Sequence, residues 1–572
     1  MASIGSDSTR YHEHLDFLLQ GGKALARAFP RVADRLAGPT FDPDVERLLE
    51  GIAFIASKIE DKHDHGLPEI CQLMFDVLFP HYLCPVPPAT IAEFVGEPAL
   101  IPRGTMLEAI PVLGTACRFQ TAYDVELTGL KLEQATCTPA GRGLQLTLTL
   151  SGDDLMPGAV DRLTLHLHGE PLLTRSLFHW LLTRLDSVEL LDRHARPMAT
   201  STTLRPRPLG YAAQEALFPW PTGTFSGFRL FQEYFAAPEK FLFLELAPLQ
   251  ELLASIPPAP AGEATTFSLR FNLKVDHQPL AVTRQDFRLN CTPVVNLFPH
   301  SADPVQWDTR RPSYRVRPAG PHLHYQTYRV LRVVGWGKHH TTHYPLLSEL
   351  DIEQDTDRFC QIMRQEVDGQ IVTRMYVHDP ISDTTPQTLL VDLLCSNGAI
   401  SQGLHMGDSC RPQAPFHNHD CRLIGAINPA TSVPVGEELR WRLIRHLALA
   451  QRELTNLEAI RDTLFLYNFS AIRDRHTARA LTLLLRGIQH AKTELAQHHQ
   501  RRIPVWGHTT TVALDGSAFD SEAELYLFGC VLNEYVALQA SLNAFSELMI
   551  KETRSQETYR WPRRLGRHPL TR

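Results

Sequence analysis

The densest group of potential metal ligands in the sequence comprises Cys410, His417, His419 and Cys421, in the segment SCRPQAPFHNHDC. Zinc prefers thiolate and imidazole ligands, and a closed tetrahedral site needs four of them. If the segment is extended, however, His417 and His419 point to opposite faces, and the spacing matches no common zinc module. We therefore expect a polar loop here, and a metal-dependent enzyme that uses these four residues is the alternative hypothesis.

Two further segments approach a catalytic motif without completing it. Segment GWGK (335–338) resembles the end of a phosphate-binding loop, but Arg332 stands where the first glycine is required and His339 follows the lysine. Segment GTFSG (223–227) has the wrong spacing for a nucleophile elbow. The other histidine clusters are interpreted as solvated loops or helix ends. We therefore expect no catalytic residue, no metal and no cofactor.

The composition is that of a large globular protein. At 572 residues the chain is too long for one hydrophobic core, and its net charge is -7. The lack of a basic excess argues against nucleic-acid binding, and no run of about 18 apolar residues predicts a membrane span. The segment MASIGSDSTRYHEH lacks the pattern of a secretory signal. We therefore expect a cytoplasmic protein without direct membrane insertion, whose scattered cysteines stay reduced.

Amphipathic helices are predicted in the N-terminal helical region (1–90). One helix is expected over 11–29, a second is capped by Asp42, and a third begins at Pro68. The second helix carries an apolar stripe that includes Ile52, Ile55 and Ile59. The proline-rich segment 80–90 cannot continue a helix, so we expect a domain boundary there.

The middle of the chain changes to strand-like periodicity. Segments such as LQLTLTLSG and TTFSLRFNLKV alternate apolar and polar residues, as half-buried strands do. We expect three β-rich parts, which are 91–205 with a helix near 172–185, 206–300 with an aromatic-rich segment, and 301–435 with histidine-rich loops. No regular strand–helix alternation indicates a doubly wound sheet.

Helices return in the C-terminal helical region (436–550). They are predicted over 439–454, from about 456, over 477–498 and over 521–550, with a β insert near 508–516. The last of these helices should present Leu532, Tyr535 and Leu542 on one apolar face. Residues 551–572 are expected to form a loose basic tail. The predicted fold class is therefore α+β and multidomain, with helical N-terminal and C-terminal regions flanking two or three β-rich domains.

The aromatic-rich segment GTFSGFRLFQEYFAAPEKFLFLEL contains Phe228, Arg229, Phe231 and Tyr234. It is interpreted either as the core of a β-rich domain or as a surface that docks a partner, because aromatic residues and arginine dominate protein interfaces. If the segment is buried, polar groups such as Arg229 and Glu233 need partners.

Five stretches together resemble the TssF (ImpG or VasA) family of the bacterial type VI secretion baseplate. They are DPDVERLLEGIAFIASKIEDK with LFPHYLCPVPPAT, IPRGTMLEA with CRFQTAYDVEL, GFRLFQEYFAAPEKFLFLEL, LNCTPVVNLF with ADPV, and RWRLIRHLAL with VLNEYVALQASLNAFSEL. They occur in family order and span nearly the whole chain, whereas residues 315–435 depart from the family pattern.

The resemblance implies a structural role, in a fold similar to a wedge protein of contractile phage tails, and carries over no catalytic residue. Subunits of this family join a TssG-like subunit, typically two copies to one TssG-like chain, together with TssK-like and TssE-like proteins. Six such wedges surround the spike hub at the inner face of the bacterial envelope and seed the contractile sheath. We expect the apolar stripe, the aromatic segment or the last helix to bind these partners or a second copy of the chain. A carbohydrate-binding, tail-fibre-like module is a third hypothesis, which the scattered thiols disfavour.

Overall fold

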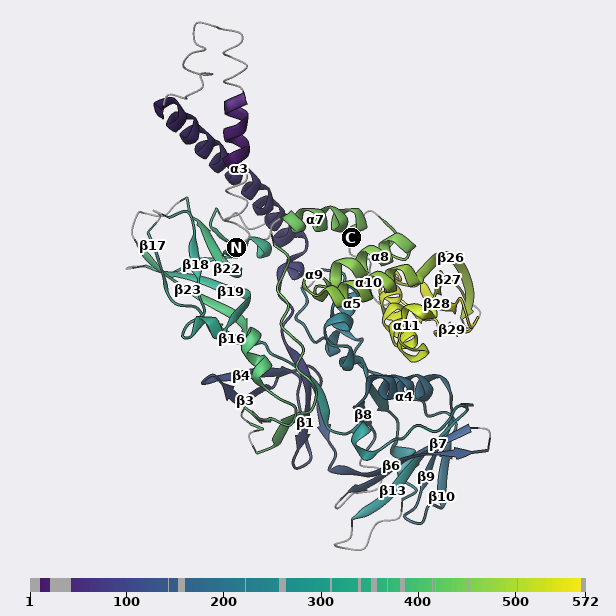
Figure 1. Cartoon of the computed structure of the whole chain (residues 1–572). Coiled ribbons are helices and arrows are strands. Elements are labelled where there is room, and N and C mark those ends of the chain that lie inside the picture. Colours follow the sequence, from purple (N-terminus) through teal and green to yellow (C-terminus); the bar gives the residue numbers. More distant parts are fainter. Residues whose placement is uncertain are drawn as a thin grey trace.

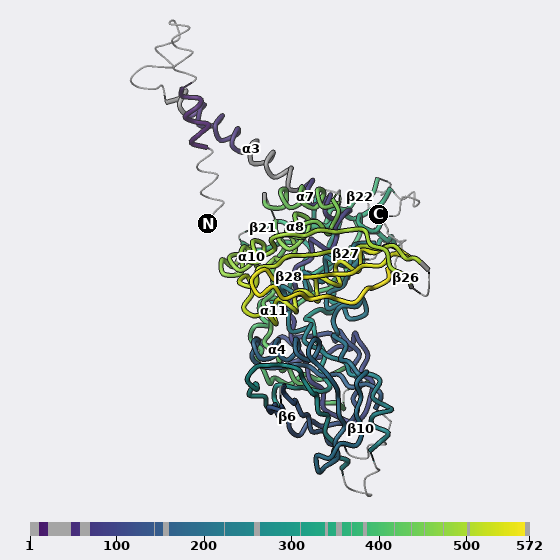
Figure 2. The backbone as a smooth tube through the Cα atoms, turned by 90° about the vertical axis from the view of Figure 1, so that its right-hand side faces the viewer, coloured from purple at the N-terminus to yellow at the C-terminus, as the bar shows by residue number. Residues whose placement is uncertain are grey.

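The protein is an elongated body from which one long helix, α3, extends (Figure 1, Figure 2). The computed structural model describes residues 11–20, 43–141, 143–152, 160–221, 223–256, 264–308, 311–337, 341–350, 357–367, 369–380, 386–413, 415–416, 418–435, 437–450, 452–500 and 503–566. Helices and strands both contribute to the body, in several separate sheets. The predicted α+β, multidomain class is confirmed.

Helix α3 (Pro43–Leu78) is continuous over 36 residues and about 54 Å long. The predicted start of a new helix at Pro68 is wrong, because the loss of one backbone hydrogen bond at this proline does not end the helix. One end of α3 packs against α7 (Glu437–Ala450). Its other half extends beyond the body, beside a helix of residues 11–20 (Figure 1, Figure 2). Residues 21–29 of the predicted first helix lie outside the described part.

A closed barrel joins strands from three distant parts of the sequence. Its strand order is β1 (Ala89–Val95), β15 (Cys291–Val295), β4 (Thr115–Thr121), β3 (Met106–Val112), β24 (Ser409–Pro412) and β25 (Asp420–Leu423). Beside it, β2 (Ala99–Ile101) pairs with β5 (Val125–Leu127). Phe94, Phe119 and Leu423 are among the apolar side chains that fill the barrel. Closure leaves no free sheet edge, which makes the barrel a rigid support.

Two sheets lie below the C-terminal helices in Figure 1. The first has the order β10 (Pro197–Ser201), β9 (Leu185–Leu191), β13 (Thr265–Leu273), β7 (Gly143–Gly152) and β6 (Leu130–Ala140). The second has the order β11 (Arg207–Pro208), β12 (Phe243–Leu246), β8 (Leu163–Leu167) and β14 (Phe287–Arg288). Strands from 91–205 and 206–300 share both sheets, so these two predicted ranges do not fold as separate domains.

Helix α4 (Pro171–Thr183) confirms the helix predicted near 172–185, and it packs against a C-terminal helix, α11 (Glu522–Ala537). The predicted alternation also holds, since every second side chain of β7 is buried along most of the strand. Alternation arises because successive side chains of a strand point to opposite faces.

The third β-rich part contains two sheets around one core. One has the order β16 (Phe298–Ser301), β23 (Gln387–Ser396), β19 (Gln326–Trp336) and β20 (Thr341–Tyr344), with β17 (Val305–Trp307) also pairing with β23. The other has the order β18 (Tyr314–Val316), β22 (Gln370–His378) and β21 (Phe359–Val367). The predicted range 301–435 is too long, because β24 and β25 belong to the barrel.

The C-terminal part combines helices with a sheet. The helices are α7, α8 (Leu457–Tyr467), α9 (Ser470–Arg473), α10 (Arg475–Gly487) and α11. The sheet has the order β26 (Ile488–Gln500), β27 (Ile503–Leu514), β28 (Phe545–Glu552) and β29 (Thr558–Arg560), and β30 (Arg564–Leu565) also pairs with β28. Because β27 and β28 are parallel, α11 is the crossover between them.

Three predictions for this part are wrong. The helix predicted over 477–498 ends at Gly487, and the helix predicted over 521–550 ends at Ala537. The tail predicted to be loose from residue 551 is held in the sheet as far as Leu565 by β29 and β30, and residues 567–572 lie outside the described part. In each case, pairing in the sheet outweighs the local sequence pattern.

Candidate interaction surfaces

Of the three described members of the four-residue metal group, the structure brings together the two cysteines alone. Cys410 and Cys421 lie directly opposite each other on β24 and β25, and both are buried in the barrel. The Nε2 atom of His419 instead lies 3.2 Å from the carbonyl oxygen of Glu97, and His417 lies outside the described residues. Among the residues that the structure describes, no group of three or more histidine, cysteine or acidic side chains could hold a metal ion.

The environment of the two cysteines also disfavours metal ligation. A hydrogen bond with Cys410 and burial both raise the pKa of the Cys421 thiol. A thiol must lose its proton to bind zinc, and burial among apolar side chains opposes this. The hypothesis of a metal-dependent enzyme therefore gains no support from the described residues.

The aromatic segment is packed inside the chain. Its central part forms α5 (Gly227–Ala236), whose Phe228 ring stacks on Tyr467 of α8 at 4.9 Å between centroids. The ring of Phe231 lies 4.8 Å from that of Tyr535 in α11. These are the distances at which aromatic pairs stabilise a core. The segment therefore joins the β-rich middle to the C-terminal helices.

This burial corrects several candidate interface residues. Phe231, Leu532 and Tyr535 are fully buried, and Phe228 and Arg229 nearly so. None of these side chains can contact a partner unless the core opens. Tyr234 is partly buried and packs on Phe528 of α11, with 5.8 Å between the ring centroids. Leu542 remains exposed, but it lies in the loop after α11 instead of on a helix face.

Buried charges within α5 have the partners that their burial requires. One carboxylate oxygen of Glu233 accepts hydrogen bonds from the backbone N–H groups of Leu217 and Phe218, at 2.7 and 3.1 Å. The other accepts one from Arg229 at 2.9 Å and one from Lys240. Burial raises the pKa of Glu233, but Arg229 and Lys240 outweigh it and hold the pKa below its ordinary value. Glu233 is therefore ionised and ties α5 to two neighbouring segments.

Segment 80–90, predicted to be a domain boundary, is a buried junction between the two helical regions. The Tyr82 hydroxyl accepts a hydrogen bond of 2.8 Å from Arg442 of α7. The Nε2 atom of His81 lies 2.7 Å from the hydroxyl of Tyr467. The prolines of this segment prevent a long helix, as predicted, but they do not expose the chain.

His446 of α7 lies at the centre of this junction. The rings of Phe75, Phe79 and Tyr82 surround it, with centroids at 5.3, 4.9 and 4.4 Å. Its Nδ1–H donates to the carbonyl oxygen of Arg442 at 2.8 Å, whereas the buried Nε2 has no partner within the described part of the chain. Burial lowers the pKa of His446 to about 4, so the ring is neutral near pH 7.

The outer half of α3 presents an exposed apolar surface. Leu48, Ile52 and Ile55 are 63, 44 and 59% exposed and recur at the spacing of one helix face. We call these three residues the α3 stripe. Ala53 is fully buried on another face of the same helix, so one side of this segment is covered and the stripe is not. The side chain of Ile59 lies outside the described residues.

Two exposed apolar pairs were not predicted. Trp441 and Ile444 are exposed on α7, and Leu495 and Trp506 are exposed on β26 and β27. The pairing of Leu495 with His508 and of Gln497 with Trp506 places Leu495 and Trp506 on one face of the hairpin. The alternation of PVWGHTTTV was a signal for this strand, but alternation does not tell which face stays uncovered.

Comparisons with known proteins agree with this architecture. Residues 8–568 match the family described as "Type VI secretion system, TssF". The chain is 27% identical to the type VI secretion system component TssF1 of Pseudomonas aeruginosa, and the match covers 98% of each chain. No helix among the described residues is long and apolar enough to cross a membrane.

Two solved assemblies contain chains of similar structure. A chain in a TssK–TssF–TssG baseplate subcomplex of the type VI secretion system is 25% identical, with a TM-score of 0.78 over 92% of this chain and 100% of that chain. A chain in a type VI secretion baseplate complex has a TM-score of 0.59 over 98% of this chain and 100% of that chain, and at 24% identity it supports the fold alone. Since the family match extends over nearly the whole length, this chain belongs to the TssF family of the type VI secretion system.

Proposed function

We propose that this chain is a structural subunit of the type VI secretion baseplate wedge, and that the α3 stripe is the surface through which it binds a helical partner. Family membership and the resemblance to a chain of the TssK–TssF–TssG subcomplex support the role. The observation that carries the proposed contact is the exposed stripe on a helix that extends from the body.

The exposure of the stripe is unfavourable in water. Leu48, Ile52 and Ile55 are each about half exposed or more, and complete burial of such a side chain contributes about 1.5–3 kcal/mol. Apolar residues at this spacing fit the grooves of a second helix. A partner helix along α3 would therefore gain several kcal/mol from these three side chains alone.

A TssG-like subunit is the partner proposed for this surface, with two copies of the present chain to each TssG-like chain. We propose that the α3 helix of the second copy packs in one bundle with the α3 helix of the first copy and the helix of the TssG-like subunit. TssK-like and TssE-like proteins and the spike hub are the further proposed contacts, in an assembly at the inner face of the cell envelope. A TssK and a TssG chain are present in the solved subcomplex, which supports these two partners most directly.

Co-expression with the TssG-like subunit, followed by gel filtration, tests the proposal. We expect the wild-type chain to elute with its partner and an Ile52→Glu/Ile55→Glu variant to elute alone, because two carboxylates cannot be buried without partners. Leu172→Glu is the matched control, since Leu172 is 55% exposed on α4, away from α3. Co-elution of the double variant at the wild-type ratio would contradict the role of the stripe, and a wild-type chain indifferent to the partner would contradict the function itself.

A further inference from the structure

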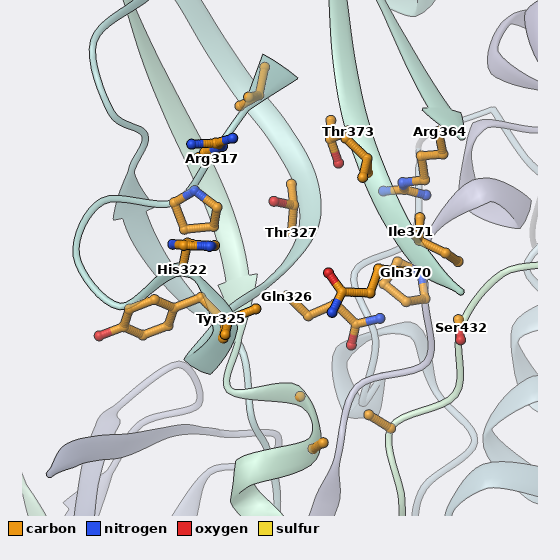
Figure 3. Close-up of a pocket in the computed structure, with 18 of the residues that line it drawn as sticks. Arg317, His322, Tyr325, Gln326, Thr327, Arg364, Gln370, Ile371, Thr373 and Ser432 are labelled. Atoms are coloured by element: carbon orange, nitrogen blue, oxygen red, sulfur yellow. The ribbon is translucent and has the colours of Figure 1, made fainter. Parts of the chain in front are cut away.

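A hollow of about 420 Å³ opens beside strand β18, between the ends of β19 and β22 (Figure 3). Arg317 and His322 line one side of it and Arg364 the opposite side, with Gln326 and Gln370 between them (Figure 3). We call this hollow and its lining the arginine pocket. It is separate from the α3 stripe, and the predicted site residues do not include any of its members.

The charged side chains that line the arginine pocket are all positive. Arg315, Arg317 and Arg364 contribute guanidinium groups, and none of the described residues that line the pocket is acidic. Arg315 and Arg317 are exposed and point to the same face, because they are two positions apart in extended backbone. Within the described part of the chain, these two arginines make no ion pair.

Arg364 is held differently from the other two arginines. It is 8% exposed, and one of its terminal N–H groups donates to the carbonyl oxygen of Tyr328. The Asp76 carboxyl group of α3 interacts electrostatically with the Arg364 guanidinium, although Asp76 does not line the pocket. The packing of Arg364 therefore fixes one guanidinium in advance, which lowers the entropy lost when a ligand binds.

The positive surface continues on the other side of β18. A neighbouring hollow of about 490 Å³ shares Arg315 and Arg317, and it adds Arg311, Arg374 and one acidic residue, Asp303. Arginine binds carboxylates and phosphates through two parallel hydrogen bonds, so a surface of this kind is suited to an extended anion.

The apolar part of the lining distinguishes between kinds of anion. Leu323 and Ile371 lie among the arginines, and Leu323 is largely exposed. An inorganic anion makes no use of these side chains, whereas a peptide with alternating acidic and apolar residues does. A nucleic acid is disfavoured by the net charge of -7. In addition, the ring of Tyr325 packs on His300 with 4.5 Å between centroids and is not free to stack on a base.

We propose that the arginine pocket binds an acidic segment of a partner protein, whose carboxylates pair with Arg315, Arg317 and Arg364 while an apolar residue packs on Leu323 and Ile371. The segment lies across the mouth of the pocket and continues toward Arg374. This contact is independent of the α3 stripe and adds a second, charge-selective attachment to a helical one.

The first test measures binding of a fluorescein-labelled Glu-Glu-Leu-Glu-Glu peptide to the full chain by fluorescence anisotropy. We expect Arg315→Glu/Arg317→Glu to weaken binding at least about tenfold, because two charge-assisted contacts are lost. The control Arg193→Glu/Arg196→Glu makes the same change of charge at an exposed turn between β9 and β10 and should leave binding unchanged. Equal weakening by both double variants would overturn the proposal, as would displacement of the peptide by inorganic phosphate or by a single-stranded oligonucleotide at equal concentration.

The second test locates the partner segment in the assembled complex. Arg317→Lys places a primary amine in the pocket, and a carbodiimide joins that amine to any carboxylate in direct contact. We expect mass spectrometry to find this amine joined to an acidic side chain of another chain, and the amine of Arg193→Lys not to be joined to one. Products confined to this chain would overturn the proposal. Gel filtration of the same sample measures separately whether the complex assembles. A complex that assembles without this cross-link would contradict the proposed pocket contact, whereas the absence of a complex would contradict the proposed function.

Discussion

The neutral, buried His446 makes the junction between α3 and α7 sensitive to acid. Its pKa is lowered by burial from 6.5 to about 4, while the ring in an unfolded chain keeps the ordinary value. Between these two pH values the unfolded state binds one more proton than the folded state, so stability falls as the pH is lowered from 6.5 toward 4. At 1.36 kcal/mol per pH unit, the interval corresponds to about 3 kcal/mol.

His446→Phe should remove the part of this sensitivity that His446 causes, whereas His81 in the same junction, whose pKa burial also lowers, keeps its own part. A phenyl ring fills the same space between Phe75 and Tyr82 and takes away the buried Nε2 that has no partner in the described part of the chain. The variant also loses the hydrogen bond to the carbonyl of Arg442, which costs about 1 kcal/mol at pH 7. We therefore expect a slightly less stable protein at neutral pH and a protein more stable than the wild type by about 2 kcal/mol near pH 4.5.

Hydrogen exchange of peptides from α7 is the appropriate assay, because the chain has several cores and this measurement reports the opening of one junction. Opening free energies of the wild type, His446→Phe and a control, His194→Phe in an exposed turn, would be compared between pH 4.5 and 7.5. The wild type and the control should lose protection together as the pH falls. An identical pH dependence in His446→Phe would refute the assignment of this acid sensitivity to His446.

Two further changes probe the packing of α5 and of α11. Glu233→Gln leaves Arg229 and Lys240 buried without a counter-charge, and it should destabilise the protein by about 3–5 kcal/mol in urea unfolding, whereas Glu239→Gln on the adjacent turn should have little effect. Gly529→Ala adds a Cβ that would lie 2.5 Å from the ring of Trp561 and 2.9 Å from Ile550. The thermal midpoint should therefore fall by an amount that corresponds to about 1–3 kcal/mol. The control Gly51→Ala, in open space on α3, should be neutral or stabilising.

The errors in the sequence-based prediction have a common physical cause. The segment QHAKTELAQHH is rich in residues that favour helices, yet it forms β26 because β27 pairs with it along nearly its whole length. Pro68 was expected to begin a new helix, but the helix runs unbroken from Pro43 to Leu78. A local sequence pattern indicates which secondary structure a segment prefers. The strand or helix that packs against the segment comes from a distant part of the chain and can override that preference.

The same limit applies to the candidate surfaces, because the sequence pattern does not show which of them are covered in the folded chain. Periodicity located Ile52 and Ile55 on one helix face and Tyr535 on another, but it could not tell which faces the chain covers by itself. The aromatic segment is covered by helices from the opposite end of the sequence, and the α3 stripe is not. The arginine pocket was missed because the alternation in YRVRP marks a strand face, while Arg364 joins it only in the folded protein.

The closed barrel has a consequence for how the chain is made. Strand β1 pairs with β15 on one side and with β25 on the other, so it gains its second neighbour only when residues 420–423 have been synthesised. At roughly 5–20 residues per second, this delay lasts tens of seconds, during which one edge of β1 is open to pairing with other chains. A nascent or truncated chain that ends before β24 also leaves β3 without its outer neighbour. Fragments of this protein that lack the last third of the sequence should therefore aggregate, even though most of the strands that precede the cut can already pair.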